Sequence, residues 1–194
     1  MAKLIGIKKI NTAVFISGTG SNLKSLLNFF SKKKTVIQIK LILSDRTKAK
    51  GLRYAKVFKV KKKVINYKNK NLAEKEILAC LNDNNIKLIC LAGFMKVLSY
   101  NLIKNFNGKI VNIHPSLLPK YKGLNTHQRV IDKKEKYSGC TVHYVNYKLD
   151  SGKIIMQKKI RIKKTDTAKT LSKRILKQEH LLYPKALLKI YPNL

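Results

Sequence analysis

Val111-Asn112-Ile113-His114-Pro115-Ser116-Leu117-Leu118-Pro119 is the stretch that decides how this chain is interpreted, because it ends an apolar strand with two polar side chains. Alternate residues of a strand share a face, so Asn112 and His114 are predicted to project together while Ile113 packs behind them. An amide donor beside a titratable imidazole is suited to hold an oxyanion and to move a proton near neutral pH. In isolation, the same pair also fits a structural histidine and a turn asparagine.

A glycine-rich turn, Ser17-Gly18-Thr19-Gly20-Ser21-Asn22, lies between the apolar residues 12–16 and the amphipathic residues 23–30. The helical spacing of the second segment indicates a strand-to-helix turn. Glycine permits close approach of a ligand, and the amides at the start of a helix attract an anion. We therefore expect a phosphate here, with a plain tight turn as the alternative, because neither the P-loop pattern nor the full dinucleotide pattern is met.

A carboxylate follows the alternating strand of residues 140–146, in the sequence Leu149-Asp150-Ser151-Gly152. If Asp150 lies near His114, it favours the imidazolium form and gives a better acid for a developing alkoxide. An ordinary Asx turn is the alternative.

The rest of the chain predicts an α/β fold, a single-domain, Rossmann-like and mostly parallel sheet flanked by helices. One domain is expected over residues 1–194, with residues 1–11 as a short basic extension. The predicted second helix begins at the N-cap Asn71, paired with Glu74. In such sheets, ligands lie beyond the carboxyl ends of the strands, where the three motifs fall. The predicted strands are residues 12–16, 36–43, 64–67, 88–91, 109–113, 140–146 and 154–160, and helices are predicted near Leu23, Leu72, Ser99, Thr126 and Thr167.

Together these motifs resemble the phosphoribosylglycinamide formyltransferase family, the folate-dependent enzymes of purine synthesis. The likeness runs in order from Thr12 to about Pro184, through residues 17–23, 91–95, 112–120, 123–124, 126–127, 138–142, 149–150 and 178–180. The resemblance implies direct transfer of the formyl group from 10-formyltetrahydrofolate to the primary amine of glycinamide ribonucleotide, with no metal. It also implies that Asn112, His114 and Asp150 are the catalytic residues.

The resemblance assigns the remaining site residues as well. The nucleotide substrate is expected on Gly20, Ser21, Asn22, Gln178 and Glu179. Glu179 shares the inward stripe of the last helix with Leu171 and Ile175, and a buried acid needs a partner. Its expected partner is the substrate ribose, and a structural ion pair with a lysine or with His180 is the alternative.

The folate is expected, by resemblance alone, on two apolar loops and one lysine. These residues are Lys70, Phe94, Met95, Lys96, Val97, Leu98, Asn146, Tyr147, Lys148 and Leu149. Two positions depart from the family pattern: Lys96 replaces an expected arginine and loses its planar fork, and Asn125 replaces a frequent histidine. His127 and His143 are interpreted as packed, satisfied residues, and the three cysteines as buried free thiols.

The net charge of the chain, taken alone, is more typical of a nucleic-acid-binding protein. Lys and Arg number 43 against nine Asp and Glu, a formal net charge of +34. Such a charge attracts polyanions and steers phosphorylated ligands, but here it is spread between ordinary apolar segments. We therefore expect small-molecule substrates, no specific nucleic acid, no membrane partner, and a cytoplasmic monomer or homodimer.

Three alternative functions remain. Methionyl-tRNA formyltransferase shares the catalytic pattern. It is expected, however, to have a further C-terminal domain and to lack the phosphate-binding glycine loop. Formyltetrahydrofolate hydrolase shares the pattern too, with an expected N-terminal regulatory domain. A non-catalytic nucleic-acid binder on a retained fold is disfavoured, because all three predicted catalytic residues are present.

Overall fold

A computed structural model describes residues 9–32 and 35–192 of the chain, and within them seven strands form one sheet in the order β3-β2-β1-β4-β5-β6-β7. Neighbouring strands are parallel from β3 to β5, and the last two are antiparallel. The strands are β1 (Ile10–Ile16), β2 (Ile37–Ser44), β3 (Lys61–Val64), β4 (Leu88–Leu91), β5 (Lys109–His114), β6 (Tyr137–Tyr144) and β7 (Ile154–Arg161). This arrangement confirms the predicted mostly parallel α/β sheet.

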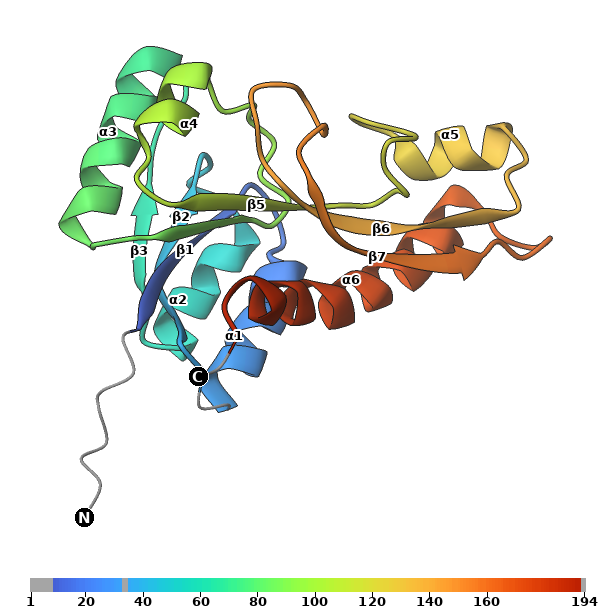
Figure 1. Ribbon diagram of the computed structural model, residues 1–194, viewed down its shortest axis with the longest axis horizontal. Coiled ribbons are helices and arrows are strands. Elements are labelled where there is room, and N and C mark those ends of the chain that lie inside the picture. The colour runs from blue at the N-terminus through green and yellow to red at the C-terminus, as the bar shows by residue number, and fades with distance from the viewer. Residues whose placement is uncertain (1–8, 33–34, 193–194) are drawn as a thin grey trace.

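Helices cover both faces of the sheet (Figure 1). On one face lie α1 (Ser21–Lys32) and α6 (Ala168–Ile190), and on the other lie α3 (Lys70–Asp83) and α4 (Tyr100–Asn105). Short helical segments fill two connections: η1 (Lys50–Arg53) with α2 (Tyr54–Val57), and α5 (Thr126–Asp132).

The central strand shows why two layers of helices are needed. Val14 and Ile16 of β1 join the apolar cluster on the α1 and α6 side, whereas Ala13 and Phe15 join the cluster of α3 and α4. All four are fully buried. A parallel strand that is apolar on both faces must be covered on both.

Several predicted boundaries are wrong. The predicted strand at residues 64–67 lies instead at Lys61–Val64, because β3 is an edge strand whose position follows its pairing with β2. The N-cap of α3 is Asn69, whose Oδ1 accepts from Leu72 N at 3.1 Å, and not Asn71. Glu74 is buried and accepts from the backbone and hydroxyl of Ser99 instead.

Two further features differ from the prediction. The sequence pattern does not predict the segment η1 and α2. Of the predicted N-terminal extension, residues 1–8 lie outside the described residues, and Ile10 and Asn11 already belong to β1. No helix among the described residues is long and apolar enough to cross a membrane.

Candidate active site

The end of β5 places two predicted catalytic side chains against the antiparallel strand β6. Asn112 pairs with His143 across the ladder, and His114 pairs with Thr141. The Nδ2 atom of Asn112 lies 3.2 Å from Nε2 of His143, whose Nδ1 lies 2.8 Å from the Tyr144 carbonyl oxygen. This contact makes His143 part of the site.

The surroundings of His143 determine which way the Asn112 amide faces. A carbonyl only accepts hydrogen bonds, so Nδ1 of His143 carries a proton toward Tyr144. Burial, in part offset by this backbone hydrogen bond, lowers the pKa of His143 below its usual 6.5 and favours the neutral ring. Nε2 then accepts, which requires the NH₂ group of Asn112 to face it and leaves the second N–H free to donate elsewhere.

Asp150 lies between the two histidines. Its Oδ2 is 3.4 Å from Nδ1 of His114 and its Oδ1 is 3.7 Å from Nε2 of His143. Oδ2 also accepts from the backbone N–H of Gly123 at 2.8 Å. The side chains of Asp150 and His114 are 8% and 7% exposed, so their attraction is little screened by solvent.

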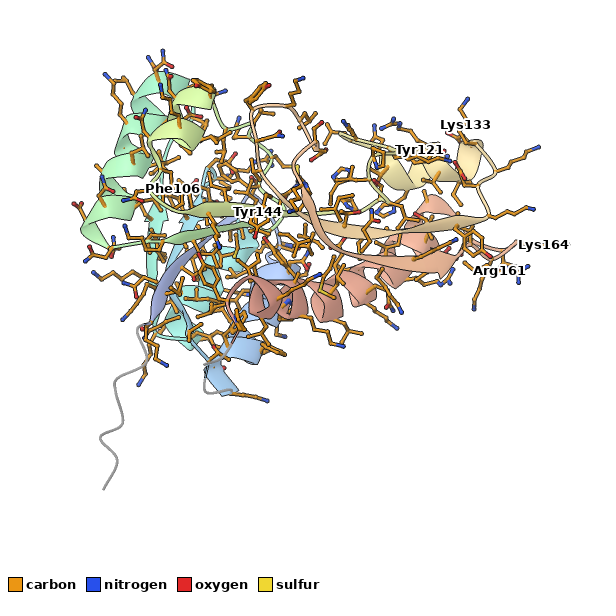
Figure 2. The ribbon with its side chains drawn as sticks, viewed as in Figure 1. Phe106, Tyr121, Lys133, Tyr144, Arg161 and Lys164 are labelled. Atoms are coloured by element: carbon orange, nitrogen blue, oxygen red, sulfur yellow. The ribbon has the colours of Figure 1, made fainter. Side chains whose placement is uncertain are left out.

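His114 is held at both ring nitrogens. Nε2 lies 2.9 Å from the Tyr121 carbonyl oxygen, while Nδ1 faces Asp150. Both neighbours accept hydrogen bonds, so a doubly protonated imidazolium satisfies both. Figure 2 shows Tyr121 beside α5, where the loop after β5 returns over the sheet.

The glycine turn at the end of β1 is built from two segments. Gly20 has φ +71°, and a Cβ there would lie 2.8 Å from the Cα of Gly51, at the start of the η1–α2 segment. The N–H of Gly51 donates to the Gly18 carbonyl at 3.0 Å, and a Cβ on Gly51 would meet Ile16 Cδ1 at 2.6 Å. Gly51 therefore packs against the predicted phosphate-binding turn, a contact that the sequence reasoning missed.

Glu179 is buried on α6, as its stripe with Leu171 and Ile175 predicted. Its partner is neither a lysine nor His180: Asn22 Nδ2, in the first turn of α1, donates to Oε2 at 2.7 Å. Burial raises the pKa of Glu179, and the Asn22 hydrogen bond opposes that shift in part. Oδ1 of Asn22 is buried and has no partner among the described residues, so the pair keeps an acceptor unused.

The first predicted folate loop is hydrogen-bonded to the glycine turn. The N–H of Ser17 donates to the Gly93 carbonyl at 3.1 Å, and Oγ of Ser17 accepts from the Met95 N–H at 2.8 Å. The two predicted ligand loops therefore form one edge of the site.

Apolar side chains are exposed on both predicted folate loops. Met95 and Val97 are more than half exposed, as are Tyr147 and Leu149. The loops approach each other where the Tyr147 ring meets that of Tyr100, with centroids 6.3 Å apart.

The predicted folate residues are not all available to a ligand. Phe94 and Leu98 are buried in the α3 and α4 cluster, and Phe94 packs edge-to-face on Phe15. Asn146 uses its Oδ1 to accept from the backbone of Lys148 at 3.0 Å. Lys70, Lys96 and Lys148 are exposed.

Two expectations for other side chains need correction. His127 is not satisfied, because its buried Nδ1 has no partner in the described part of the chain; burial and the charge of His114 lower its pKa. Cys80 is half-buried, whereas Cys90 and Cys140 are buried. Among residues 9–32 and 35–192, no three His, Cys, Asp or Glu side chains are grouped to hold a metal ion.

Relatives of known structure have the same fold. Phosphoribosylglycinamide formyltransferase from Brucella melitensis superposes with a TM-score of 0.90 and 40% identity, covering 96% of this chain and 98% of that one. The enzyme of that name from Haemophilus influenzae is 39% identical over 92% of this chain and 84% of its own length.

The chain also matches longer proteins. It is 40% identical over 93% of its length to the trifunctional purine biosynthetic protein adenosine-3 of Bos taurus, but spans 18% of that protein. The family model described as formyl transferase matches residues 10–187, nearly the whole chain. The chain therefore belongs to the formyl transferase family.

Proposed function

We propose that this chain is a phosphoribosylglycinamide formyltransferase, which transfers the formyl group of 10-formyltetrahydrofolate to the amine of glycinamide ribonucleotide in purine biosynthesis. The observation that carries the proposal is the convergence of Asn112, His114 and Asp150 at the end of β5, where His143 contacts both Asn112 and Asp150. Relatives that carry this name are similar over nearly their whole length. The chain acts in the cytoplasm, without a metal, as a monomer or homodimer.

Attack of the neutral amine on the formyl carbon produces a tetrahedral alkoxide, and Asn112 stabilises it. His143 accepts from one N–H of the amide, so the other is oriented for the oxyanion before the reaction begins. A preorganised donor of this kind contributes about two to three orders of magnitude in rate.

His114 and Asp150 supply the charge in this mechanism. The buried carboxylate of Asp150 lies 3.4 Å from Nδ1 of His114, and a positive charge on this ring stabilises the alkoxide. A direct hydrogen bond from Nε2 to the substrate requires the Tyr121 carbonyl to give up its contact. An ordered water relays the amine proton to the departing N10 of the folate.

The nucleotide binds at the junction of α1 and α6. Its phosphate is held by Gly20, Ser21 and Asn22 at the start of α1, where free amides and the helix dipole favour an anion. Glu179 accepts from the ribose hydroxyls, with Gln178 beside it. The unused acceptor Oδ1 of Asn22 supports a ligand donor here.

The folate lies across the two apolar loops. The exposed side chains of Met95, Val97, Tyr147 and Leu149 offer surface to a flat ring, while Phe94 and Leu98 support the first loop from the core. Backbone groups of this loop and of Asn146 to Leu149 bond the pterin edge. The cations Lys70, Lys96 and Lys148 face the carboxylates of the glutamate tail.

The test is a formyl-transfer assay with two acceptors, glycinamide ribonucleotide and charged initiator tRNA. Wild-type protein is expected to use the small amine, and Asn112→Ala is expected to lower kcat about a hundredfold or more with little change in KM. Transfer to the tRNA alone would assign the chain to the tRNA-modifying relatives instead. Near-normal turnover of Asn112→Ala would remove that residue from the oxyanion role.

A further inference from the structure

Tyr183 of α6 reaches into the sheet between β4 and β5, the strands that precede the proposed folate loop and carry Asn112. The side chain is fully buried, and its hydroxyl lies 3.0 Å from both the Leu91 and the Val111 carbonyl oxygens. Carbonyls only accept, so the hydroxyl donates one proton that the two share. Burial raises the pKa of Tyr183 well above its usual value, which keeps the proton in place.

One carbonyl belongs to the residue just before Asn112, and the other to the residue that ends the strand before the folate loop. Val111 precedes Asn112, and Leu91 is the last residue of β4, two residues before Gly93. Leu91 is paired with Asn112 in the parallel ladder. A single hydroxyl therefore joins the start of the folate loop to the strand position that carries the oxyanion donor.

The same turn of α6 is bonded to α1. Glu179 accepts from Asn22 at 2.7 Å, as described above. Pro184 lies inside the helix and has no N–H, so the His180 carbonyl lacks its helical donor. The Ser25 hydroxyl of α1 occupies that acceptor at 2.9 Å. One helical turn thus connects the start of α1 with the ends of β4 and β5.

We propose that Tyr183 is a positioning residue for formyl transfer, a role that rests on the proposed function: its hydroxyl fixes the Asn112 amide relative to the folate loop. It touches no reacting atom and acts through the Leu91 and Val111 carbonyls. Without the hydroxyl, both carbonyls lose a buried donor and the two strand ends separate by a fraction of an ångström. Small misplacements of reacting groups lower the rate of the chemical step more than they weaken substrate binding.

Tyr183→Phe tests this role, because it keeps the ring and removes the hydroxyl alone. We expect kcat to fall about tenfold to a hundredfold, with the KM of both substrates within about twofold of wild type. Two controls separate positioning from lost stability. Tyr54→Phe removes the hydroxyl of another buried tyrosine, which contacts Arg53, and Ile77→Val weakens the core on the opposite face of the sheet.

Both controls are expected to retain wild-type kcat below their melting temperatures. An unchanged kcat in Tyr183→Phe overturns the proposal, as does an equal loss in Ile77→Val. A second readout is the amide NMR signals of Asn112 and Gly93, which are expected to shift in Tyr183→Phe and not in Tyr54→Phe. If wild-type protein transfers no formyl group, the proposed function fails, whereas unmoved signals contradict the positioning role itself.

Discussion

Individual side chains in this site owe their orientation to neighbours that are distant in sequence. The Asn112 amide is oriented by His143, which accepts a hydrogen bond from one of its N–H groups, and His143 is oriented by the Tyr144 carbonyl. The strand alternation correctly predicts that Asn112 and His114 share a face. It gives no information on His143, since the register of β6 against β5 follows from tertiary pairing.

Replacing His143 should therefore disturb catalysis through Asn112. His143→Ala is expected to lower kcat about tenfold to a hundredfold with little change in either KM, because the amide loses the acceptor that orients it. Ser138→Ala is a matched control, since Ser138 is buried on the same strand and its hydroxyl has no partner in the described chain. Steady-state kinetics at pH 7 test this prediction. Equal kcat values for the two variants would contradict the orienting role of His143.

Glu179 should show a conflict between binding and stability. Its pKa is raised in the folded protein, so its contribution to stability is complete below the unfolded pKa and is lost as the pH rises through the folded pKa. Glu179→Gln cannot ionise and keeps an oxygen that accepts from Asn22. Relative to wild type, its melting temperature is expected to rise as the pH increases above the ordinary glutamate pKa of about 4.

The same variant should bind the nucleotide more weakly. Loss of a charged acceptor for the ribose is expected to raise the KM of glycinamide ribonucleotide about tenfold or more. Thermal unfolding across pH and steady-state kinetics measure the two effects. A melting-temperature difference that does not vary with pH would show that the carboxyl is not destabilised by burial, and an unchanged KM would remove it from the ribose site.

At the scale of elements, hydrophobic periodicity locates the strands and helices more reliably than their ends. The seven strands were anticipated, yet β3 is displaced because its sequence, Lys-Lys-Lys-Val, has no apolar pattern and pairing alone positions it. The segment η1 and α2 was missed, although its Gly51 completes the glycine turn. A single glycine in a lysine-rich segment gives no sign of that contact.

Two glycines of the turn can be replaced to separate the effect of backbone strain from the effect of a lost ligand contact. Gly51→Ala places a Cβ 2.6 Å from Ile16 Cδ1 and 3.0 Å from the Gly20 Cα, so the Ile16 side chain must move and the Gly20 backbone must give way slightly. This variant is expected to lose about 1–3 kcal/mol of stability and to raise the KM of the nucleotide. At Gly18, by contrast, an added Cβ meets no atom within 4 Å.

Gly18→Ala should accordingly keep the melting temperature of wild type. The added methyl group faces open space in the turn that is proposed to bind the phosphate, so the nucleotide KM is expected to rise. The KM of the folate is the internal reference for both variants and should change little. Equal changes in the KM of both substrates, or none, would show that this turn is not the phosphate site.

Over the whole molecule, part of the positive charge lies on the edges of the sheet, where it opposes pairing with another chain. The two edge strands of the sheet are lysine-rich: β3 carries Lys61, Lys62 and Lys63, and β7 carries Lys158 and Lys159. Charged side chains on edge strands oppose pairing with another chain. Figure 2 shows Lys133, Arg161 and Lys164 extending outward at the end of the molecule near α5 and β7.

Because the chain carries a net charge of +34, added salt should stabilise the fold but weaken the binding of anionic ligands. Self-repulsion is screened by salt, so the melting temperature should rise between about 0.05 M and 0.2 M NaCl. Binding to tRNA or duplex DNA should fall steeply over the same range and show no sequence preference. Formyl transfer to glycinamide ribonucleotide should persist, with a modest rise in KM as steering weakens. Thermal unfolding, filter binding and the transfer assay on one preparation measure the three effects. Tight, salt-resistant binding to one RNA would identify a specific nucleic-acid partner that the spread of charge does not predict.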